Sequence, residues 1–285
     1  MKTLQSFIFS LILLFICGCA SQKRLNSFFF IQMADTQFGF FTDNQDFKKE
    51  TINFERAIAE ANRLRPAFVV VCGDLVNKAG DTDQITEYKR IAATLNPVIK
   101  LYNVAGNHDV ENVPTTKSLT DYKKHFGKDY FTFQSGNLLG IVLNSSLMKA
   151  PDSAREAARD QELWLTSTLE QARSSKRTPI VIFQHHSLFL TEPGEAGQYF
   201  NFPIEKRKAY LELFRKSGVQ YIFAGHYHRN AMGKADDLEM VTTGPVGKPL
   251  GVDPSGFRII IVKGDVLRHS YHSLDSIPKL IPVKP

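Results

Sequence analysis

The sequence lacks several features that would define its class at once. Its 285 residues include only three cysteines, and no run of five like charges occurs. It has no repeat with a period of about 20 to 50 residues, which excludes a solenoid. No internal linker rich in Pro, Gly or Ser divides it, so one domain is favoured over two. The net charge of +6 is spread along the chain. This gives little support to a nucleic-acid-binding patch and only a mild attraction for anionic ligands.

The N-terminus carries an apolar run that is too short to cross a membrane. Lys2 precedes Phe7 to Ile16, and the segment Ile16-Cys17-Gly18-Cys19-Ala20 follows. A small residue before a cysteine at the end of such a run resembles the lipobox of bacterial lipoproteins. The resemblance implies that residues 1–18 are a cleaved signal peptide and that residues 19–27 are a tether lipidated at Cys19. We therefore expect an exported, membrane-anchored lipoprotein that faces the periplasm or the cell exterior. A plain cleaved signal or a short signal anchor is the alternative.

The cysteines do not form a disulfide framework in this interpretation. Once Cys19 is lipidated and the signal removed, Cys72 is the one unmodified cysteine, so no intrachain disulfide can form. Cys72 ends the apolar run Phe68 to Cys72, which is typical of a buried thiol without chemistry.

Strands and helices alternate in the first half of the domain, which we place at residues 28–285. Residues 28–33, 67–72 and 98–104 are expected strands because they are aromatic and β-branched. Helices between them end at Pro66 and Pro97. This alternation predicts a parallel sheet, and ligands bind outside the carboxyl ends of such strands.

The second half adds an antiparallel hairpin and further strands. Residues 130–134 and 138–144 flank Ser135-Gly136-Asn137, which indicates a hairpin. Further expected elements are strands at 179–184, 219–224, 238–243, 257–262 and 266–271 and helices at 154–173 and 204–217. We predict an α/β fold, a four-layer α-β-β-α sandwich of two mixed β-sheets flanked by helices. The loop from Ser187 to Pro203 is either a substrate wall or a loop pinned by its own apolar residues.

Oxygen and imidazole donors follow five of the expected strands. They are Asp35, Gln37, Asp74, Asn107, His185, His226 and His228. This set exceeds the needs of one tetrahedral ion and contains no thiolate, so it suits two ions such as Mn, Fe or Zn. Two metals about 3.5–4 Å apart can clamp a displacement at phosphorus.

The order of these motifs resembles the calcineurin-like metallophosphoesterases. The matching strings are Asp35-x-Gln37, Gly73-Asp74, Gly106-Asn107-His108-Asp109, His185 and Gly225-His226-x-His228, and the likeness extends from Phe30 to about Leu274. The resemblance implies that Asp35, Gln37, Asp74 and His228 hold one divalent ion. It implies that Asp74, as a bridge, holds the second ion with Asn107, His185 and His226. A metal-bridging hydroxide would attack the phosphate ester. His108 would serve the leaving group, with Asp109 orienting its ring.

Gln37 departs from most of this family, which has histidine at that position. A neutral amide oxygen is a weaker and harder donor than imidazole. The first ion is therefore expected to be Mn²⁺ or Mg²⁺ rather than Zn²⁺, or to bind loosely.

The function expected from these residues is hydrolysis of phosphate monoesters, as in a protein phosphatase. Its substrate would be a phosphoprotein, a small phosphomonoester or a nucleotide. Two alternatives stay open: an exported phosphodiesterase or nucleotidase, and a non-catalytic lipoprotein that binds metal or phosphate. We expect a monomer without a nucleic-acid partner. His186, beside His185, is expected to be structural.

Overall fold

The computed structural model describes residues 27–174 and 179–283. Its helices are α1 (Lys48–Leu64), α2 (Thr82–Ala92), α3 (Asn107–Val110), α4 (Thr116–Phe126), α5 (Ser145–Lys149), α6 (Arg155–Ser174) and α7 (Ile204–Lys216), with a 3-10 turn at Phe40–Thr42. Its strands are β1 (Phe28–Met33), β2 (Phe68–Cys72), β3 (Lys100–Val104), β4 (Phe131–Ser135), β5 (Leu138–Val142), β6 (Ile180–Phe183), β7 (Val219–Ala224), β8 (Ala231–Ala235), β9 (Leu238–Thr242), β10 (Gly256–Lys263) and β11 (Val266–Ser273).

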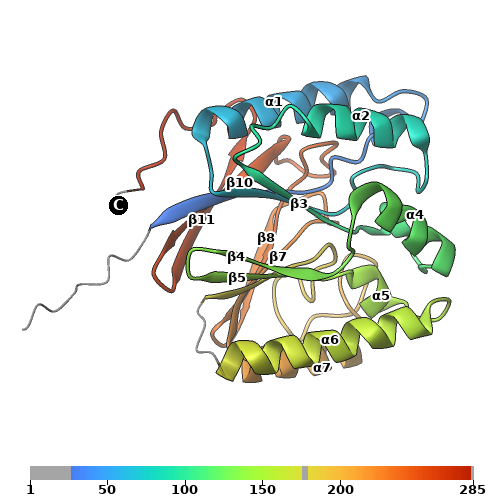
Figure 1. Ribbon diagram of the computed structural model, residues 1–285, viewed down its shortest axis with the longest axis vertical. Helices are drawn as coiled ribbons and strands as arrows, with labels where there is room; N and C mark the ends of the chain where they lie inside the picture. The colour runs from blue at the N-terminus through green and yellow to red at the C-terminus, as the bar shows by residue number, and fades with distance from the viewer. Residues whose placement is uncertain (1–26, 175–178, 284–285) are drawn as a thin grey trace, which may run out of the picture.

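The strands form two sheets that face each other. One sheet has the order β11-β10-β1-β2-β3, and the other has the order β4-β5-β6-β7-β9-β8. In the first sheet β1, β2 and β3 are parallel, and in the second β5, β6, β7 and β9 are parallel. The remaining pairs are antiparallel, so both sheets are mixed. Helices α1 and α2 cover the outer face of the first sheet, and α6 and α7 cover the outer face of the second (Figure 1). The predicted four-layer sandwich is confirmed.

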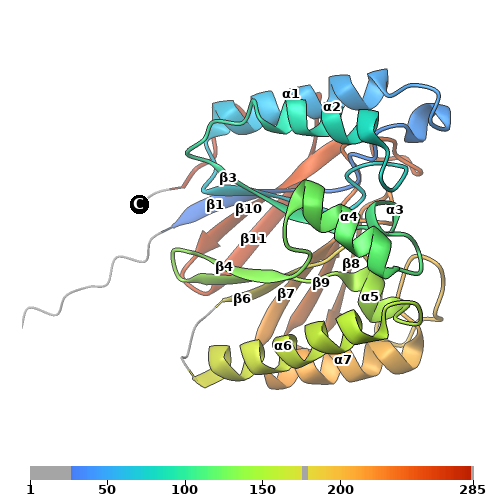
Figure 2. The same ribbon diagram turned by 45° about the vertical axis from the view of Figure 1, so that its right-hand side comes forward.

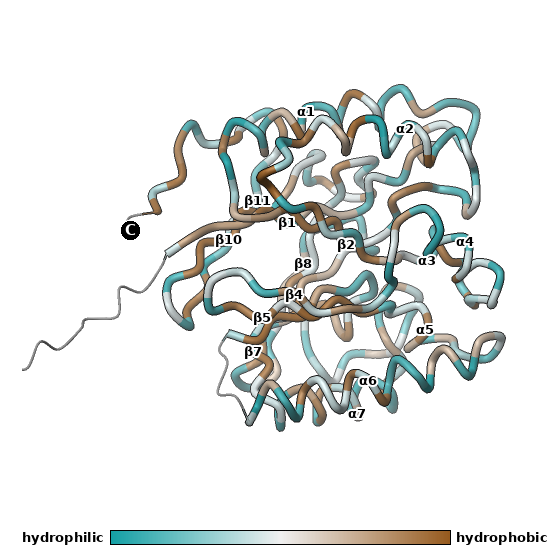
Figure 3. The backbone as a smooth tube through the Cα atoms, viewed as in Figure 1, coloured by the Kyte–Doolittle hydropathy of each residue, from teal (hydrophilic) through white to brown (hydrophobic). Residues whose placement is uncertain are grey.

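Three hydrophobic layers hold the four layers together. Phe30, Phe68, Phe183 and Phe223 are fully or almost fully buried between the two sheets. Their rings meet, for example with 4.5 Å between the centroids of Phe30 and Phe68. Separate apolar clusters lie between each sheet and its helices. Figure 3 shows the result, with strongly hydrophobic strands inside and alternating hydropathy along the outer helices. This alternation is expected of helices that bury one face.

Local signals set the ends of several elements. The Asp81 side chain accepts hydrogen bonds from the amides of Asp83 and Gln84 and so caps α2. Helix α1 ends where Arg65 adopts a positive φ of 59° before Pro66. The third strand begins at Lys100 rather than at the predicted Val98, which is 83% exposed after Pro97. Strand β8 was not predicted, because its sequence, Ala-Met-Gly-Lys-Ala, has few strand-forming residues.

The parallel strands of both sheets run toward the side of the molecule that carries α3, α4 and α5 (Figure 2). The described part of the chain begins with β1 on the opposite side, where it also ends. None of the helices in the described ranges is both long and apolar enough to span a membrane.

Candidate metal centre

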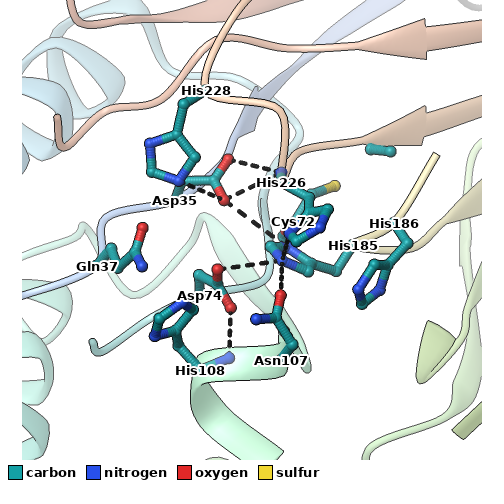
Figure 4. A network of polar contacts seen from close by, with 12 residues as sticks. Asp35, Gln37, Cys72, Asp74, Asn107, His108, His185, His186, His226 and His228 are labelled. Carbon is teal, nitrogen blue, oxygen red and sulfur yellow. Dashed lines mark hydrogen bonds and ion pairs between the residues drawn. The ribbon is translucent and has the colours of Figure 1, made fainter. Parts of the chain in front are cut away.

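All seven predicted ligands lie together at the carboxyl ends of strands. Asp35 and Gln37 follow β1, Asp74 follows β2 and Asn107 follows β3, all from the first sheet. His185 follows β6, and His226 and His228 follow β7, from the second sheet. Figure 4 shows these side chains turned toward one another from the two sheets. The sandwich thus joins donors that are nearly 200 residues apart in the sequence.

The donors divide into two overlapping groups. One group is Asp74, His185 and His226, the other is Asp35, Asp74 and His228, and in each the ligand atoms lie within 4.8 Å of one another. Asp74 belongs to both groups. This is the arrangement in which two divalent ions share one carboxylate.

Asn107 joins the group around His185. The Nε2 atom of His185 lies 3.0 Å from Oδ1 of Asn107, 3.1 Å from Oδ2 of Asp74 and 3.1 Å from Nδ1 of His226. All four side chains are at least 96% buried. Four donor atoms therefore converge in a buried position, a suitable arrangement for a cation.

Backbone carbonyls fix the direction of the histidine rings. The Nδ1 of His185 lies 2.9 Å from the Cys72 carbonyl, and Nδ1 of His228 lies 2.6 Å from the Lys248 carbonyl. The Nε2 of His226 lies 3.1 Å from the Tyr199 carbonyl. A carbonyl oxygen only accepts, so each of these nitrogens carries the proton. The other nitrogen of each ring then offers its lone pair to the centre, as in metal sites.

Gln37 also presents a free donor atom. Its Nε2 donates to Oδ1 of Asn77 at 3.1 Å, which fixes the orientation of the amide. Its Oε1 is buried and finds no hydrogen-bond partner among the described residues. Leaving such an oxygen unpaired costs free energy unless another group satisfies it. A metal ion at the Asp35–Asp74–His228 group would do so.

Backbone strain is concentrated at the ligands. Asp35, Gln37, Asp74, His226 and His228 all have positive φ, between 38° and 69°. This region is unfavourable for residues with a side chain, and strain of this kind gathers at functional sites. Positive φ ends the extended conformation of each strand, so these ligands lie in the turns that follow the strands.

Glycines before the ligands allow the strand ends to approach. A Cβ on Gly106 would lie 2.1 Å from the backbone nitrogen of Asp74, and a Cβ on Gly73 would lie 2.4 Å from Nδ1 of His185. Gly73 also has a φ of +83°. Both positions therefore exclude any side chain.

The buried carboxylates and His185 perturb one another. Burial raises the pKa of Asp35 to about 6, although His228 and His185 oppose this effect. Burial alone would lower the pKa of His185, but Asp74 and Asp35 outweigh it and raise the pKa to about 9. Burial alone would raise the pKa of Asp74, but the attraction to His185 outweighs it and lowers the pKa below its ordinary value. The negative charge of the site is therefore balanced by a proton when no cation is bound.

His108 lies beside the ligands, and its contacts involve the backbone amide and one ring nitrogen. Its backbone amide donates to Oδ1 of Asp74 at 2.8 Å, and its Nδ1 lies 2.7 Å from the Asn77 carbonyl. Among the described residues, the Nε2 atom of this ring has no hydrogen-bond partner. The contact with Asn77 could not be predicted from the sequence, because Asn77 lies in a loop and reaches His108 only when the chain is folded.

Asp109 does not orient this ring. Its carboxylate accepts the backbone amides of Leu75 and Val76 at 2.9 and 3.1 Å, and that of Gly106 at 2.8 Å. The predicted contact with His108 is therefore wrong. Asp109 instead ties the loop after β2 to the loop after β3, which places Asp74 beside Asn107.

The loop from residue 187 to 203 is pinned and lies beside the site. Arg207 of α7 is fully buried and donates to the carbonyls of Leu188, Pro193, Glu195 and Phe202. The loop carries Tyr199, which is 53% exposed and whose ring centroid lies 4.9 Å from that of His226. The loop's own Leu188, Phe189 and Phe202 are fully buried and also pin it, as one of the two interpretations expected, whereas its role as a substrate wall stays a prediction.

Two neighbouring residues have structural roles. His186 is buried, and its Nδ1 lies 3.0 Å from Oγ of Ser145. Burial and the neighbouring His226 hold its pKa well below the ordinary value. Cys72 is a free, buried thiol whose pKa is raised by burial. Neither residue belongs to the two ligand groups, as the sequence indicated.

The two facing sheets carry carboxylates and imidazoles at their strand ends, and these donors are grouped around one shared aspartate. This arrangement is typical of hydrolases that use two divalent ions. The sequence model of the calcineurin-like phosphoesterase family matches residues 30–230 of this chain. The chain belongs to this family and is a hydrolase that acts on phosphate esters.

Curated proteins that are similar to this chain in sequence include phosphatases. The serine/threonine-protein phosphatase CPPED1 of Homo sapiens is 36% identical over 266 residues, covering 88% of this chain and 85% of the relative. The protein of the same name from Danio rerio is 35% identical over 265 residues, with 88% and 86% covered.

Solved structures of lower identity share the fold. A dimetal phosphatase from Danio rerio superposes with a TM-score of 0.63 at 16% identity, covering 87% of this chain and 96% of that chain. A purple acid phosphatase from yellow lupin (Lupinus luteus) gives a TM-score of 0.62 at 14% identity, covering 87% of this chain and 52% of that one.

Proposed function

We propose that the protein is a phosphomonoesterase that removes phosphate from phosphorylated serine or threonine side chains. The observation that carries this proposal is the 36% identity to a serine/threonine-protein phosphatase across 88% of the chain. The two ligand groups around Asp74 support it, because they supply the donors that a dinuclear phosphatase needs.

The proposed division of work follows the sequence prediction. Asp35, Gln37, Asp74 and His228 hold one ion, and Asp74, Asn107, His185 and His226 hold the other. The unpaired Gln37 oxygen and the carbonyl-bound histidines support this assignment. When bound, two divalent ions activate water and neutralise charge on the phosphate.

His108 is proposed to serve the leaving group. The Asn77 carbonyl holds its Nδ1–H, so the ring presents Nε2 toward the substrate. In the imidazolium form Nε2 gives its proton to the oxygen that departs from phosphorus. Asp109 contributes by fixing the backbone on which His108 and Asp74 stand.

Turnover by the full-length protein, purified in mild detergent, tests this function. With added Mn²⁺ it should hydrolyse a phosphoserine peptide faster than the diester bis(4-nitrophenyl) phosphate. His108→Ala should lower kcat by about 10²-fold or more while Mn²⁺ still binds. His125→Ala, on α4, is the control and should keep the wild-type rate. Faster diester hydrolysis would favour a phosphodiesterase, and tight phosphate binding without turnover would favour a binding protein.

The metal preference is proposed to follow Gln37. Because this ligand is a neutral oxygen, we infer that Mn²⁺ or Mg²⁺ supports activity better than Zn²⁺. Activity measured after removing all metal and adding back one ion at a time tests this preference. Higher activity with Zn²⁺ than with Mn²⁺ would contradict it.

We also propose that the protein is an exported lipoprotein, with residues 1–18 removed and Cys19 lipidated. The support is the sequence around Gly18-Cys19, which lies outside the described residues. Because β1 begins on the side opposite α3, a tether there would turn the metal centre away from the membrane (Figure 2). Cys19→Ala should release the protein from membranes and abolish labelling by radioactive palmitate. Unchanged labelling would exclude lipidation at Cys19.

A further inference from the structure

Aromatic rings stand on both sides of the candidate metal centre. The centroid of the Phe40 ring lies 5.1 Å from that of the His228 ring, beside the group of Asp35, Asp74 and His228. The ring of Tyr199 lies 4.9 Å from that of His226, beside the group of Asp74, His185 and His226.

A third ring extends this arrangement next to His226. Tyr227 packs edge-on against Phe200 at 5.2 Å, and Phe200 lies 5.6 Å from the His226 ring. Each of the three rings carries a basic group over its face. The pairs are Lys248 and Phe40 at 5.1 Å, Lys149 and Tyr199 at 5.5 Å, and Arg229 and Tyr227 at 5.0 Å, each from the cation to the ring centroid. We call Lys149, Arg229 and Lys248 the cationic collar.

The collar is attached to the ligands themselves. Lys149 donates to the Tyr199 carbonyl, the same oxygen that lies 3.1 Å from Nε2 of His226. The carbonyl of Lys248 lies 2.6 Å from Nδ1 of His228, and Arg229 directly follows that histidine in the chain. Lys149 is therefore held beside His226 through its side chain, and Lys248 and Arg229 lie beside His228 through their backbones.

The collar has no carboxylate partner in the described part of the chain. The ion pairs formed by residues 27–174 and 179–283 do not include Lys149, Arg229 or Lys248. All three are partly buried, and burial lowers the pKa of Lys149 to about 8. An unpaired ammonium in such a place is unfavourable, and a bound anion would offset the cost.

We propose that the collar binds carboxylates that flank the scissile phosphate, so that the substrate is a phosphorylated serine or threonine within an acidic polypeptide segment. This inference rests on the proposed phosphomonoesterase function. The metal ligands and His108 account for the phosphate itself, and the collar is additional positive charge. Arginine and lysine suit this task, because guanidinium pairs with carboxylate through two parallel hydrogen bonds and ammonium offers a point charge.

The placement of the cations favours a polypeptide over a small anion. Lys149 lies on the His226 side of the centre and Lys248 on the His228 side. An extended peptide advances about 3.3 Å per residue, so acidic residues before and after the phosphorylated one can reach both sides. A mononucleotide carries its charge on one side of the scissile bond only. The overall charge of +6 would assist the approach of such a segment.

A matched pair of peptides tests the inference on the full-length protein with Mn²⁺. Both carry one phosphoserine, with glutamate at the flanking positions in one and glutamine in the other, and 4-nitrophenyl phosphate serves as a third substrate. The expected kcat/KM is about 10-fold higher for the glutamate peptide at low salt, falling toward equality near 1 M salt. Lys149→Gln and Lys248→Gln should each reduce this ratio by about 3-fold or more. Lys263→Gln, at an exposed position of β10, should leave the ratio unchanged.

The ratio separates specificity from general damage, because a defect in the centre slows both peptides alike. Equal kcat/KM for the two peptides, with 4-nitrophenyl phosphate still hydrolysed, would overturn the collar proposal and leave the phosphomonoesterase intact. A preference for glutamate that survives both lysine variants would also overturn it. Absence of turnover on all three substrates would instead overturn the proposed function and the inference with it.

Discussion

Gln37 is the ligand whose chemistry differs from the others. Asp35, Asp74 and the histidines attract a cation by charge or by a strong lone pair, whereas an amide oxygen is a weak donor. The structure nevertheless holds Gln37 at a positive φ of 38°, with Nε2 bonded to Asn77 and Oε1 without a partner among the residues described. A strained backbone and a buried oxygen without a partner are both unfavourable, and a cation bound to that oxygen would offset the cost.

Gln37→Ala should therefore weaken binding of one Mn²⁺ by about 10-fold or more while the second site is retained. Calorimetric titration of the metal-free protein measures both sites. Gln45→Ala, at an exposed position, is the matched control and should bind as wild type does. Identical titrations of Gln37→Ala and wild type would show that this side chain is not a ligand.

Asp109 supports the backbone under the site. Its two oxygens accept three backbone amides from two different loops. In Asp109→Asn, one of these oxygens becomes an NH₂ group, so at least one buried amide loses its acceptor. The free energy of unfolding should fall by about 1–3 kcal/mol, measured by urea denaturation. Asp121→Asn on the surface of α4, whose ion pair with Lys117 is screened by solvent, should leave the free energy of unfolding close to that of the wild type. Equal stability of Asp109→Asn and wild type would refute this role.

At the scale of elements, the loop from 187 to 203 depends on one side chain of α7. The guanidinium of Arg207 satisfies four loop carbonyls, and Glu195 accepts the amides of Leu190 and Thr191 at 2.7 and 2.9 Å. The loop therefore has fixed geometry although it contains no regular element. Its position delivers the Tyr199 carbonyl to His226.

Arg207→Met should leave these buried carbonyls without donors. We expect a loss of about 2–4 kcal/mol in the free energy of unfolding, with weaker Mn²⁺ binding at the His226 side. Urea denaturation and calorimetry measure the two effects. Lys208→Met, at the next and exposed position of α7, should have neither effect. A destabilised variant with unchanged metal affinity would show that the loop does not position His226.

At the scale of the whole molecule, the metal centre joins the two sheets. Asp35, Asp74 and Asn107 come from one sheet, and His185, His226 and His228 come from the other. Ions bound between them would hold the strand ends together, and they require the folded arrangement because the donors are far apart in sequence.

Divalent ions should therefore raise the thermal stability of the protein. Mn²⁺ at about 100 times its Kd should contribute about 2.7 kcal/mol per site to the free energy of unfolding, and a chelator should reverse the effect. Differential scanning calorimetry of wild type and Asp74→Ala measures it. The variant should lose most of the metal-dependent increase in Tm. An equal increase in both proteins would mean that the ions stabilise the fold elsewhere.

The sequence was informative where local patterns carry the signal. The alternation of apolar runs with amphipathic helices predicted the layers, and polar residues directly after apolar runs predicted Asp35, Asp74 and His185. Strand β8 was harder to predict because Ala231–Ala235 has few strand-forming residues, although it pairs with β9. The start of β3 was harder because Val98 is a strand-forming residue that is exposed and lies outside the strand. The partner of Asp109 could not be predicted, since its acceptor geometry depends on how two loops meet.

The sequence by itself determined which residues can bind metal and in what order the strands deliver them, because strand periodicity and the identity of donor atoms are local properties. The tertiary structure decided what those donors face. It paired each of the three predicted histidine ligands with a carbonyl, left the Gln37 oxygen without a partner in the described part of the chain, and placed Lys149, Arg229 and Lys248 beside the aromatic rings of the centre. These relations depend on distances between segments that are remote in the chain, which only the packing of the two sheets fixes.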